Sequence, residues 1–393
     1  MNLLKAHYVM SEEEYKKYAL EKKGNKGVIH FSSFPNRDYF LGFDKEVMDA
    51  VLRITRKQLS FDNLFRSFDS FVQQQLIQSF FIDEVYNTNQ IENIATTKHD
   101  VFLTAQSIKS HNSGKVISCV NGYLMLLEEK DFRVKDAADV RNLYDLLLSG
   151  CLEEKDLPDG NLFRKEMVFV SDGMRSIHQG LYPEAKIISA IEEAMILFND
   201  LSVNEYLALI SFHYIFEMIH PFYDGNGRVG RFLLSSGFLK RTNSPFSYCL
   251  ASAIRNKKNK YHQAFKDTED IRNDGDLSTF VIEMIKIFES YLDVMLEKIG
   301  KSKEEISYCK EKVEQNINYS RCEKQVLNLL LEGTFFSFGG LSHEEIMKLT
   351  GVSKRTLQYV LKRNDEYLVK EKIGRLAYLK LKDSFLRSEL FYQ

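Results

Sequence analysis

The segment "HPFYDGNGRVGR", residues 220–231, concentrates residue types that handle phosphate groups. A histidine has an ordinary pKa near neutral, so His220 could take a proton from an attacking hydroxyl. Gly225 and Gly227 let the backbone approach an anion closely and present N–H groups to it. Arg228 and Arg231, three residues apart, lie on one face of a helix, and Asp224 supplies a hard oxygen ligand for Mg²⁺. Together these residues predict phosphoryl or nucleotidyl transfer.

Two predicted helices hold this segment. The run 205–219 is apolar nearly all the way round, which is typical of a buried helix, and Pro221 should end it at about His220. A second helix is expected to start near Arg228, so that its unpaired N–H groups and positive dipole end face the loop. Arginines at a helix N-terminus cost about 0.3–1 kcal/mol each, and a bound polyanion reverses that sign. The alternative interpretation is an ordinary tight turn followed by a solvated helix face.

The same segment resembles, at every defined position, the signature HxFx(D/E)GNGRxxR of Fic proteins. This resemblance implies a mainly α-helical fold and transfer of AMP from ATP to a Ser, Thr or Tyr hydroxyl of a protein. It also implies that His220 is the general base, that Phe222 anchors the loop and that Arg231 binds the γ-phosphate. The implied ATP-binding positions in the motif are Asp224, which also holds Mg²⁺, Gly225, Asn226, Gly227, Arg228, Val229, Gly230 and Arg231.

The resemblance extends beyond the motif over roughly half of the chain. Upstream, residues 161–187 resemble the family's flap, a β-hairpin that docks a target segment by strand addition; "MVFV" is strand-like and Asp172-Gly173 suits a tight turn. An ordinary surface hairpin is the alternative. The implied target-docking positions are Met174, Arg175, Ser176, Ile177 and His178. Downstream, the residues that resemble an adenosine pocket are Tyr261, His262 and Asn273, although His262 stands where the family often has a second tyrosine.

A shorter motif, "TNQIEN" at residues 88–93, matches the inhibitory pattern (S/T)xxxE(G/N) of Fic proteins at Thr88, Glu92 and Asn93. The resemblance implies that Glu92 pairs with Arg231 and prevents productive docking of the γ-phosphate. A carboxylate and a phosphate compete for the same planar guanidinium, so this inhibition is physically sound. In some relatives the same glutamate instead supports removal of AMP, and the sequence does not separate these roles. Glu92 as a plain helix-end acid is the alternative.

The C-terminal residues 341–383 resemble a winged helix-turn-helix. Ser342 and Ser353 are good helix N-caps, Gly351 separates two helical patterns, and "IGRLAYLKL" alternates like a strand. This segment carries ten Lys or Arg against six Asp or Glu. Binding of DNA and docking of a protein are both open interpretations.

Composition sets the remaining bounds. The 393 residues have a net charge of −2 and five scattered cysteines without a CxxC pair, so neither a nucleic-acid coat nor a disulfide framework is expected. No apolar run reaches about 18 residues, and we expect a cytoplasmic protein without a membrane contact. The expected regions are 1–110 with the inhibitory motif, 111–298 as the Fic core, 299–319 as a connecting helix and 320–393 as the winged-helix-like module.

Two function classes follow. The first is a Mg²⁺-dependent protein adenylyltransferase restrained by Glu92, which acts on a target protein or on itself. The second is a nucleotide-sensing, DNA-binding regulator without enzymatic activity. A sensor needs the arginines and the anion site but no base, so His220 favours the enzyme. The sequence leaves the target and the oligomeric state open, a homodimer included.

Overall fold

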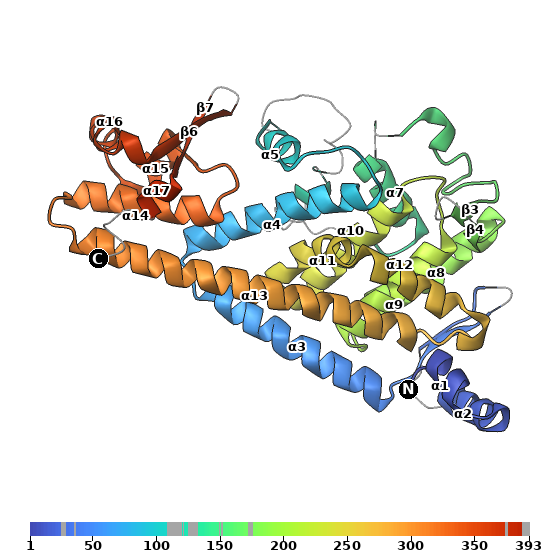
Figure 1. The fold of residues 1–393 in the computed structure, drawn as a ribbon. Coiled ribbons are helices and arrows are strands. Elements are labelled where there is room, and N and C mark those ends of the chain that lie inside the picture. Colours follow the sequence, from blue (N-terminus) through green and yellow to red (C-terminus); the bar gives the residue numbers. More distant parts are fainter. Residues whose placement is uncertain are drawn as a thin grey trace. The chain divides into compact units, whose positions relative to one another are not determined.

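The computed structural model describes residues 1–24, 29–34, 37–107, 120, 122–124, 133–148, 150, 152–171, 176–373 and 376–386. The chain is mainly helical with small antiparallel sheets (Figure 1), as the sequence predicted. It divides into two compact units, residues 1–59 with 83–293 and residues 60–82 with 294–393. These units are discontinuous because three long helices contribute to both: α3 (Lys45–Arg66), α4 (Ser70–Ile91) and α13 (Ser278–Gln315). The four regions predicted from the sequence, 1–110, 111–298, 299–319 and 320–393, divide the chain by expected function, and that division remains a prediction.

The first unit carries the signature. Its helices, besides the parts of α3, α4 and α13, are α1 (Leu3–Val9), α2 (Glu12–Gly24), α5 (Lys98–Ser107), α7 (Ala137–Leu148), α8 (Glu184–Asn199), α9 (Glu205–Ile219), α10 (Asn226–Thr242), α11 (Leu250–Asn256) and α12 (Lys258–Glu269). Short 3₁₀ turns lie at η1 (Glu154–Asp156), η2 (Pro245–Cys249) and η3 (Ile271–Asn273). Two hairpins complete it, β1 (Ile29–Phe31) with β2 (Tyr39–Leu41) and β3 (Phe169–Ser171) with β4 (Ser176–Gln179).

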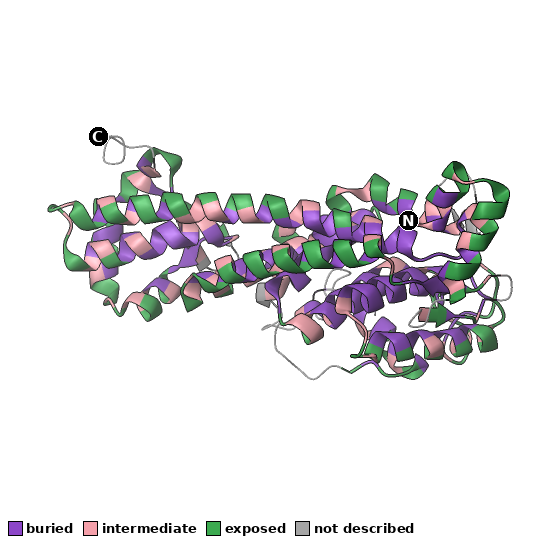
Figure 2. Cartoon of the chain, turned by 90° about the horizontal axis from the view of Figure 1, so that it is seen from below, coloured by how far each residue is buried: buried purple, intermediate pink, exposed green. Residues whose placement is uncertain are grey.

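Helix α9 is the centre of this unit. Thirteen of its 15 residues are buried, and it packs against α8 and α10; buried residues are purple in Figure 2. The Asn204 side chain caps its first turn by accepting hydrogen bonds from the N–H groups of Tyr206 and Leu207. The helix ends at Ile219, with His220 as its C-cap, so the predicted end is confirmed.

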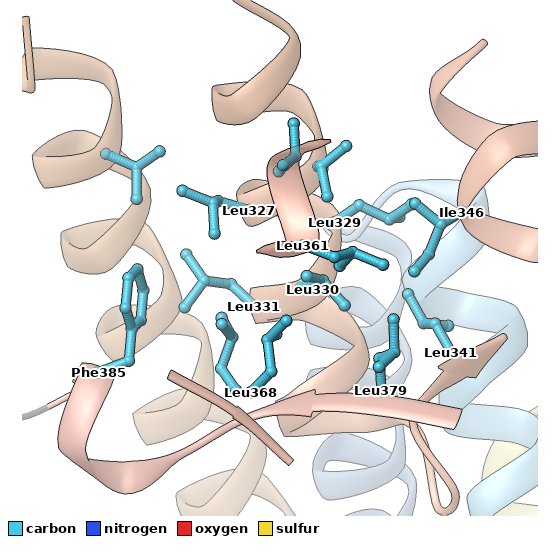
Figure 3. Close-up of a cluster of buried hydrophobic side chains, with 14 of the residues drawn as sticks. Leu327, Leu329, Leu330, Leu331, Leu341, Ile346, Leu361, Leu368, Leu379 and Phe385 are labelled. Atoms are coloured by element: carbon cyan, nitrogen blue, oxygen red, sulfur yellow. The ribbon is translucent and has the colours of Figure 1, made fainter. Parts of the chain in front are cut away.

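The second unit contains α14 (Arg321–Phe336), α15 (His343–Thr350), α16 (Lys354–Arg363), η4 (Asp365–Tyr367) and α17 (Asp383–Leu386). Its sheet has the order β5 (Leu341–Ser342), β7 (Leu376–Leu381), β6 (Leu368–Ile373), all antiparallel. Leucines from α14, α16, β6 and β7 point toward one another in its core (Figure 3). Ser342 and Ser353 cap α15 and α16 as predicted. The elements run in the order helix, strand, two helices and a pair of strands, and the winged helix-turn-helix remains a prediction.

Among the described residues, no helix is both long and apolar enough to cross a membrane.

Candidate active site

His220 lies at the end of α9 in a left-handed conformation, with φ 50° and ψ 63°. Such a conformation is uncommon for a residue with a Cβ and occurs often at functional sites. The buried Arg164 holds it in place, since its Nε donates to the His220 carbonyl at 2.9 Å. The same guanidinium donates to the carbonyls of Leu181 at 2.8 Å and Glu166 at 2.6 Å. Arg164 thus ties the residues beside the β3–β4 hairpin to the predicted base.

Burial of this guanidinium lowers the pKa of Arg164 to about 10, because it donates to neutral carbonyls, those of Glu166, Leu181 and His220, rather than to carboxylates. The sequence analysis missed Arg164. No local signal marks it, since Lys165 and Glu166 follow it directly and sequence spacing does not reveal its carbonyl partners.

The loop after His220 is fixed by two side chains. The fully buried Phe222 stacks on Tyr144 with ring centroids 3.8 Å apart. Asn226 accepts from the Phe222 N–H and donates to the Phe222 carbonyl, both at 2.9 Å. The Asn226 side chain therefore shapes the loop, and what it offers to a ligand is its backbone N–H.

Helix α10 begins at Asn226, two residues before the predicted start near Arg228. Gly225, at φ 88°, is the N-cap, and this left-handed backbone is the reason a glycine stands there. The first N–H groups of a helix have no intrahelical partner, so those of Asn226, Gly227 and Arg228 form an anion-binding end. The predicted glycine cradle is therefore the first turn of α10 itself.

Arg231 meets the predicted inhibitory residues directly. Its Nη2 donates to Glu92 Oε1 at 2.7 Å and to the Thr88 carbonyl at 3.2 Å, and its Nε donates to Thr88 Oγ1 at 2.9 Å. Glu92 follows the last residue of α4, and Asn93 turns the chain away with φ 57°. The structure thus brings Glu92 and Thr88, which stand 139 and 143 positions before Arg231, against one buried guanidinium.

The Glu92 carboxylate also lies over the first turn of α10. A Cβ on Gly227 would collide with Glu92 Oε1, so the carboxylate could not keep this position beside any larger residue. Burial raises the pKa of Glu92, but the charges of Arg231, Arg228 and Lys258 outweigh it and hold the pKa below its ordinary value. Glu92 is therefore an anion at neutral pH, and it occupies the end of α10 where a phosphate would bind.

The remaining motif residues divide into two groups. Asp224 is exposed on one side, accepts from the Gly225 N–H at 2.6 Å and pairs with Arg228 Nη2 at 3.3 Å. Val229 is fully buried, and a Cβ on Gly230 would lie 2.6 Å from Glu217 Oε1. Gly230 therefore permits the close packing of α10 on α9.

Behind Arg231 lies a set of buried polar groups that the sequence analysis did not identify. Burial raises the pKa of Glu217 to about 8 against the opposing charge of Arg231, and its Oε1 makes no hydrogen bond within the described residues. Burial lowers the pKa of His213 to about 3, so this histidine is neutral. Its Nε2 lies 2.9 Å from the Tyr261 hydroxyl.

The predicted adenosine residues have different surroundings. Tyr261 is buried against His213 beneath the site, whereas His262 is exposed. Burial and the charge of Lys258 lower the pKa of His262. Asn273 is fully buried: its Nδ2 donates to the carbonyls of Thr268 and Asp276, and its Oδ1 accepts from Thr279. The Asn273 amide is thereby engaged within the protein.

Of the predicted docking flap, the β3–β4 hairpin is present, with Phe169 opposite Gln179 and Val170 opposite His178. Met174 and Arg175 lie outside the described residues, as does the expected Asp172-Gly173 turn. Ser176, Ile177 and His178 lie in β4.

The residues present fit a magnesium ion that would take one ligand from the protein and most of its ligands from the phosphates of a bound nucleotide. Asp224 is the carboxylate at the loop, and its exposed side chain retains oxygen lone pairs beside its bonds to Gly225 and Arg228. No group of three His, Cys, Asp or Glu able to hold a metal occurs among the described residues. Mg²⁺ commonly takes one or two protein carboxylates and completes its shell with phosphate oxygens and water.

Comparisons with known proteins agree with this geometry. Residues 135–236 match the Fic/DOC family profile. A probable protein adenylyltransferase of Aquifex aeolicus is 39% identical over 72 residues, 18% of this chain. The chain spans about a fifth (20%) of the length of that curated relative. A crystal structure of a Fic family protein from Desulfovibrio desulfuricans matches with a TM-score of 0.51 and 19% identity, over 86% of this chain and 97% of that one.

Residues 135–236 are therefore similar to the Fic domain, and the mainly helical fold of the chain is similar to that of a solved Fic family protein.

Proposed function

We propose that this chain is a protein adenylyltransferase that transfers AMP from ATP to a Ser, Thr or Tyr hydroxyl of a target protein, and that Glu92 inhibits it. The observation that carries the proposal is the Glu92–Arg231 ion pair of 2.7 Å, formed over the N-terminal turn of α10, the helix that follows the loop beginning with His220. A phosphate group and the Glu92 carboxylate are both anions that a guanidinium and a helix N-terminus stabilise, so they compete for the same place.

In the proposed reaction the target hydroxyl oxygen attacks the α-phosphorus of ATP. A new P–O bond forms to the target, the bond between the α-phosphorus and the bridging oxygen breaks, and pyrophosphate leaves. His220 accepts the hydroxyl proton, and its αL backbone, held by Arg164, directs the imidazole from the end of a rigid helix. The α10 N–H groups and Arg228 stabilise the phosphate charge. Mg²⁺ held by Asp224 would neutralise further phosphate charge.

Inhibition follows from competition for one guanidinium. Arg231 is buried, and Glu92 raises its pKa above the ordinary value although burial acts in the opposite direction. While Nη2 is bound to Glu92, it is not free for a γ-phosphate. Removing the carboxylate should leave Arg231 held by Thr88 and open toward the nucleotide.

The test compares wild type, Glu92→Gly and Glu92→Gly/His220→Ala, each incubated with α-³²P-labelled ATP and Mg²⁺. Label on protein is scored for the chain itself and for a cell lysate. We expect strong labelling with Glu92→Gly, little with wild type and none with the double variant. No labelling by Glu92→Gly, despite measurable ATP binding, would sink the proposed activity.

A second role of Glu92 is tested with the same variants. Target carrying labelled AMP is purified and incubated with wild type or with Glu92→Gly. Release of AMP by wild type only would assign removal of AMP to Glu92 as well, whereas no release by either would restrict Glu92 to inhibition.

A further inference from the structure

Helices α15 and α16 form a compact helix-turn-helix in the second unit. Helix α15 ends at Gly351, whose φ of 72° turns the chain, and α16 starts three residues later at Lys354. The side chain of Ser353 caps α16 by accepting from the Thr356 N–H at 3.1 Å. A turn of three residues that contains a left-handed glycine is the connection found in DNA-binding helix pairs.

Helix α16 has two opposite faces. Leu357, Val360 and Leu361 are buried in the core of the unit, where Leu361 is labelled in Figure 3. The opposite face is exposed in the full chain. We call it the α16 face; it consists of Lys354, Arg355, Gln358, Tyr359 and Lys362.

Two cations of the α16 face stand where the helix dipole disfavours them. Lys354 and Arg355 occupy the first turn of α16, which contains no acidic residue, although cations there cost about 0.3–1 kcal/mol each. The neighbouring helix α15 follows the preference, with Glu344 and Glu345 in its first turn. A polyanion bound at the α16 face would remove this cost.

We propose that the α16 face is a DNA-binding surface that enters the major groove of a duplex. In a helix-turn-helix the first residues of the second helix reach the base edges. Arg355 and Gln358 are the residue types that pair bidentately with guanine and adenine, and Lys354 and Lys362 suit phosphates. This binding function goes beyond the proposed AMP transfer and does not depend on it.

The composition of the α16 face favours DNA over a protein partner. Protein interfaces deplete lysine at their centre and gather aromatic and apolar anchors there, whereas three of the five residues of this face are cationic. The nearest acids along the chain, Asp365 and Glu366, follow the opposite end of the helix, and Asp365 pairs with Lys370. On the hairpin, Lys372 of β6 adds an exposed cation.

The experiment measures binding of the full chain to a fluorescein-labelled random-sequence 24-base-pair duplex by anisotropy, at several KCl concentrations between 50 and 200 mM. We expect micromolar binding at 50 mM that weakens steeply with salt. Lys354→Ala/Arg355→Ala should weaken it at least tenfold and lower the slope of log Kd against log salt by about 1, since Lys354 is the phosphate contact that this variant loses and each such contact contributes about 0.9. Selection from a random duplex pool should enrich a preferred site for wild type, and Gln358→Ala should relax one position of it.

The matched control is Lys17→Ala/Lys298→Ala, which removes two exposed cations outside the α16 face and should leave DNA binding unchanged. Equal loss in the control, or no binding by wild type at 50 mM, would overturn the proposal. A self-association that Lys354→Ala/Arg355→Ala abolishes, seen by sedimentation without any DNA binding, would overturn it in favour of a second copy of the chain. AMP transfer by Lys354→Ala/Arg355→Ala in the Glu92→Gly background should be unchanged, so the two proposals fail separately.

Discussion

Ser235 Oγ donates a hydrogen bond of 2.9 Å to Glu84 Oε1, one turn along α10 and two turns along α4 from the Arg231–Glu92 ion pair. Both residues are buried. Glu84, Thr88 and Glu92 are spaced by four residues, and they meet Ser235 and Arg231 of α10, which are also spaced by four. The contacts therefore follow one line along two helices, and Glu84 sets the register at which Glu92 arrives over Gly227.

This register gives a prediction for Glu84, which also accepts from the Ala251 and Ser252 N–H groups. Glu84→Gln keeps the shape but loses acceptor capacity, so the free energy of unfolding should fall by about 1–3 kcal/mol. The helix end that carries Glu92 should loosen, and label transfer by the otherwise wild-type chain should rise severalfold. Asn204→Ala, which removes the cap of α9 and costs about 1 kcal/mol, is the control that should leave transfer unchanged. An equal rise in label transfer by Asn204→Ala would show that Glu84 acts on transfer only through general stability.

Thr88 should contribute to inhibition separately from Glu92. Thr88→Ala removes the acceptor of Arg231 Nε, so freeing the guanidinium becomes easier while Glu92 still binds Nη2. We expect label transfer between that of wild type and that of Glu92→Gly, with a loss of about 1–2 kcal/mol in stability. Thr88→Ser retains the hydroxyl and should behave as wild type. Transfer by Thr88→Ala below the wild-type level would show that Thr88 serves the active arrangement instead.

Glu217 predicts a pH dependence of stability. Its pKa rises from 4.5 to about 8 on folding because of burial, so the folded state prefers the protonated acid. The free energy of unfolding therefore falls as pH rises from about 4.5 to 8, by at most about 5 kcal/mol. Glu217→Gln lacks this loss: urea titrations should give similar stability near pH 4.5 and a more stable variant at pH 8.5. The exposed Glu13→Gln is the control, and a constant difference across pH would refute the assignment.

Sequence reasoning located this site because its information is local. The end of α9 at Pro221 and the glycines around Asn226 depend on neighbours within one turn, so the pattern predicts them well. The pairing of Glu92 with Arg231 was expected by resemblance, and the structure places the two in contact.

The roles of other site residues could not be predicted from the sequence, for physical reasons. Arg164 acts through carbonyls of residues 166, 181 and 220, and Glu217 acquires its pKa from burial by segments distant in the chain. Neither property has a local pattern. For Asn273 the sequence pattern pointed to a site, because its segment resembles the adenosine pocket. In the structure its side-chain amide instead forms hydrogen bonds with Thr268, Asp276 and Thr279 inside the fold.

Arg164 should act on the reaction by positioning His220. Arg164→Lys cannot reach three carbonyls at once, so the free energy of unfolding should fall by about 2–4 kcal/mol. In the Glu92→Gly background, label transfer should fall at least tenfold while the Kd for ATP stays within twofold, because the base moves and the anion site does not. Arg241→Lys is the matched control: Arg241 also donates to backbone carbonyls, those of Phe198 and Val203, at the far end of α10. Arg241→Lys should lower the free energy of unfolding and leave the transfer rate unchanged. If the transfer rate falls in both variants in proportion to their loss of stability, Arg164 has no positioning role.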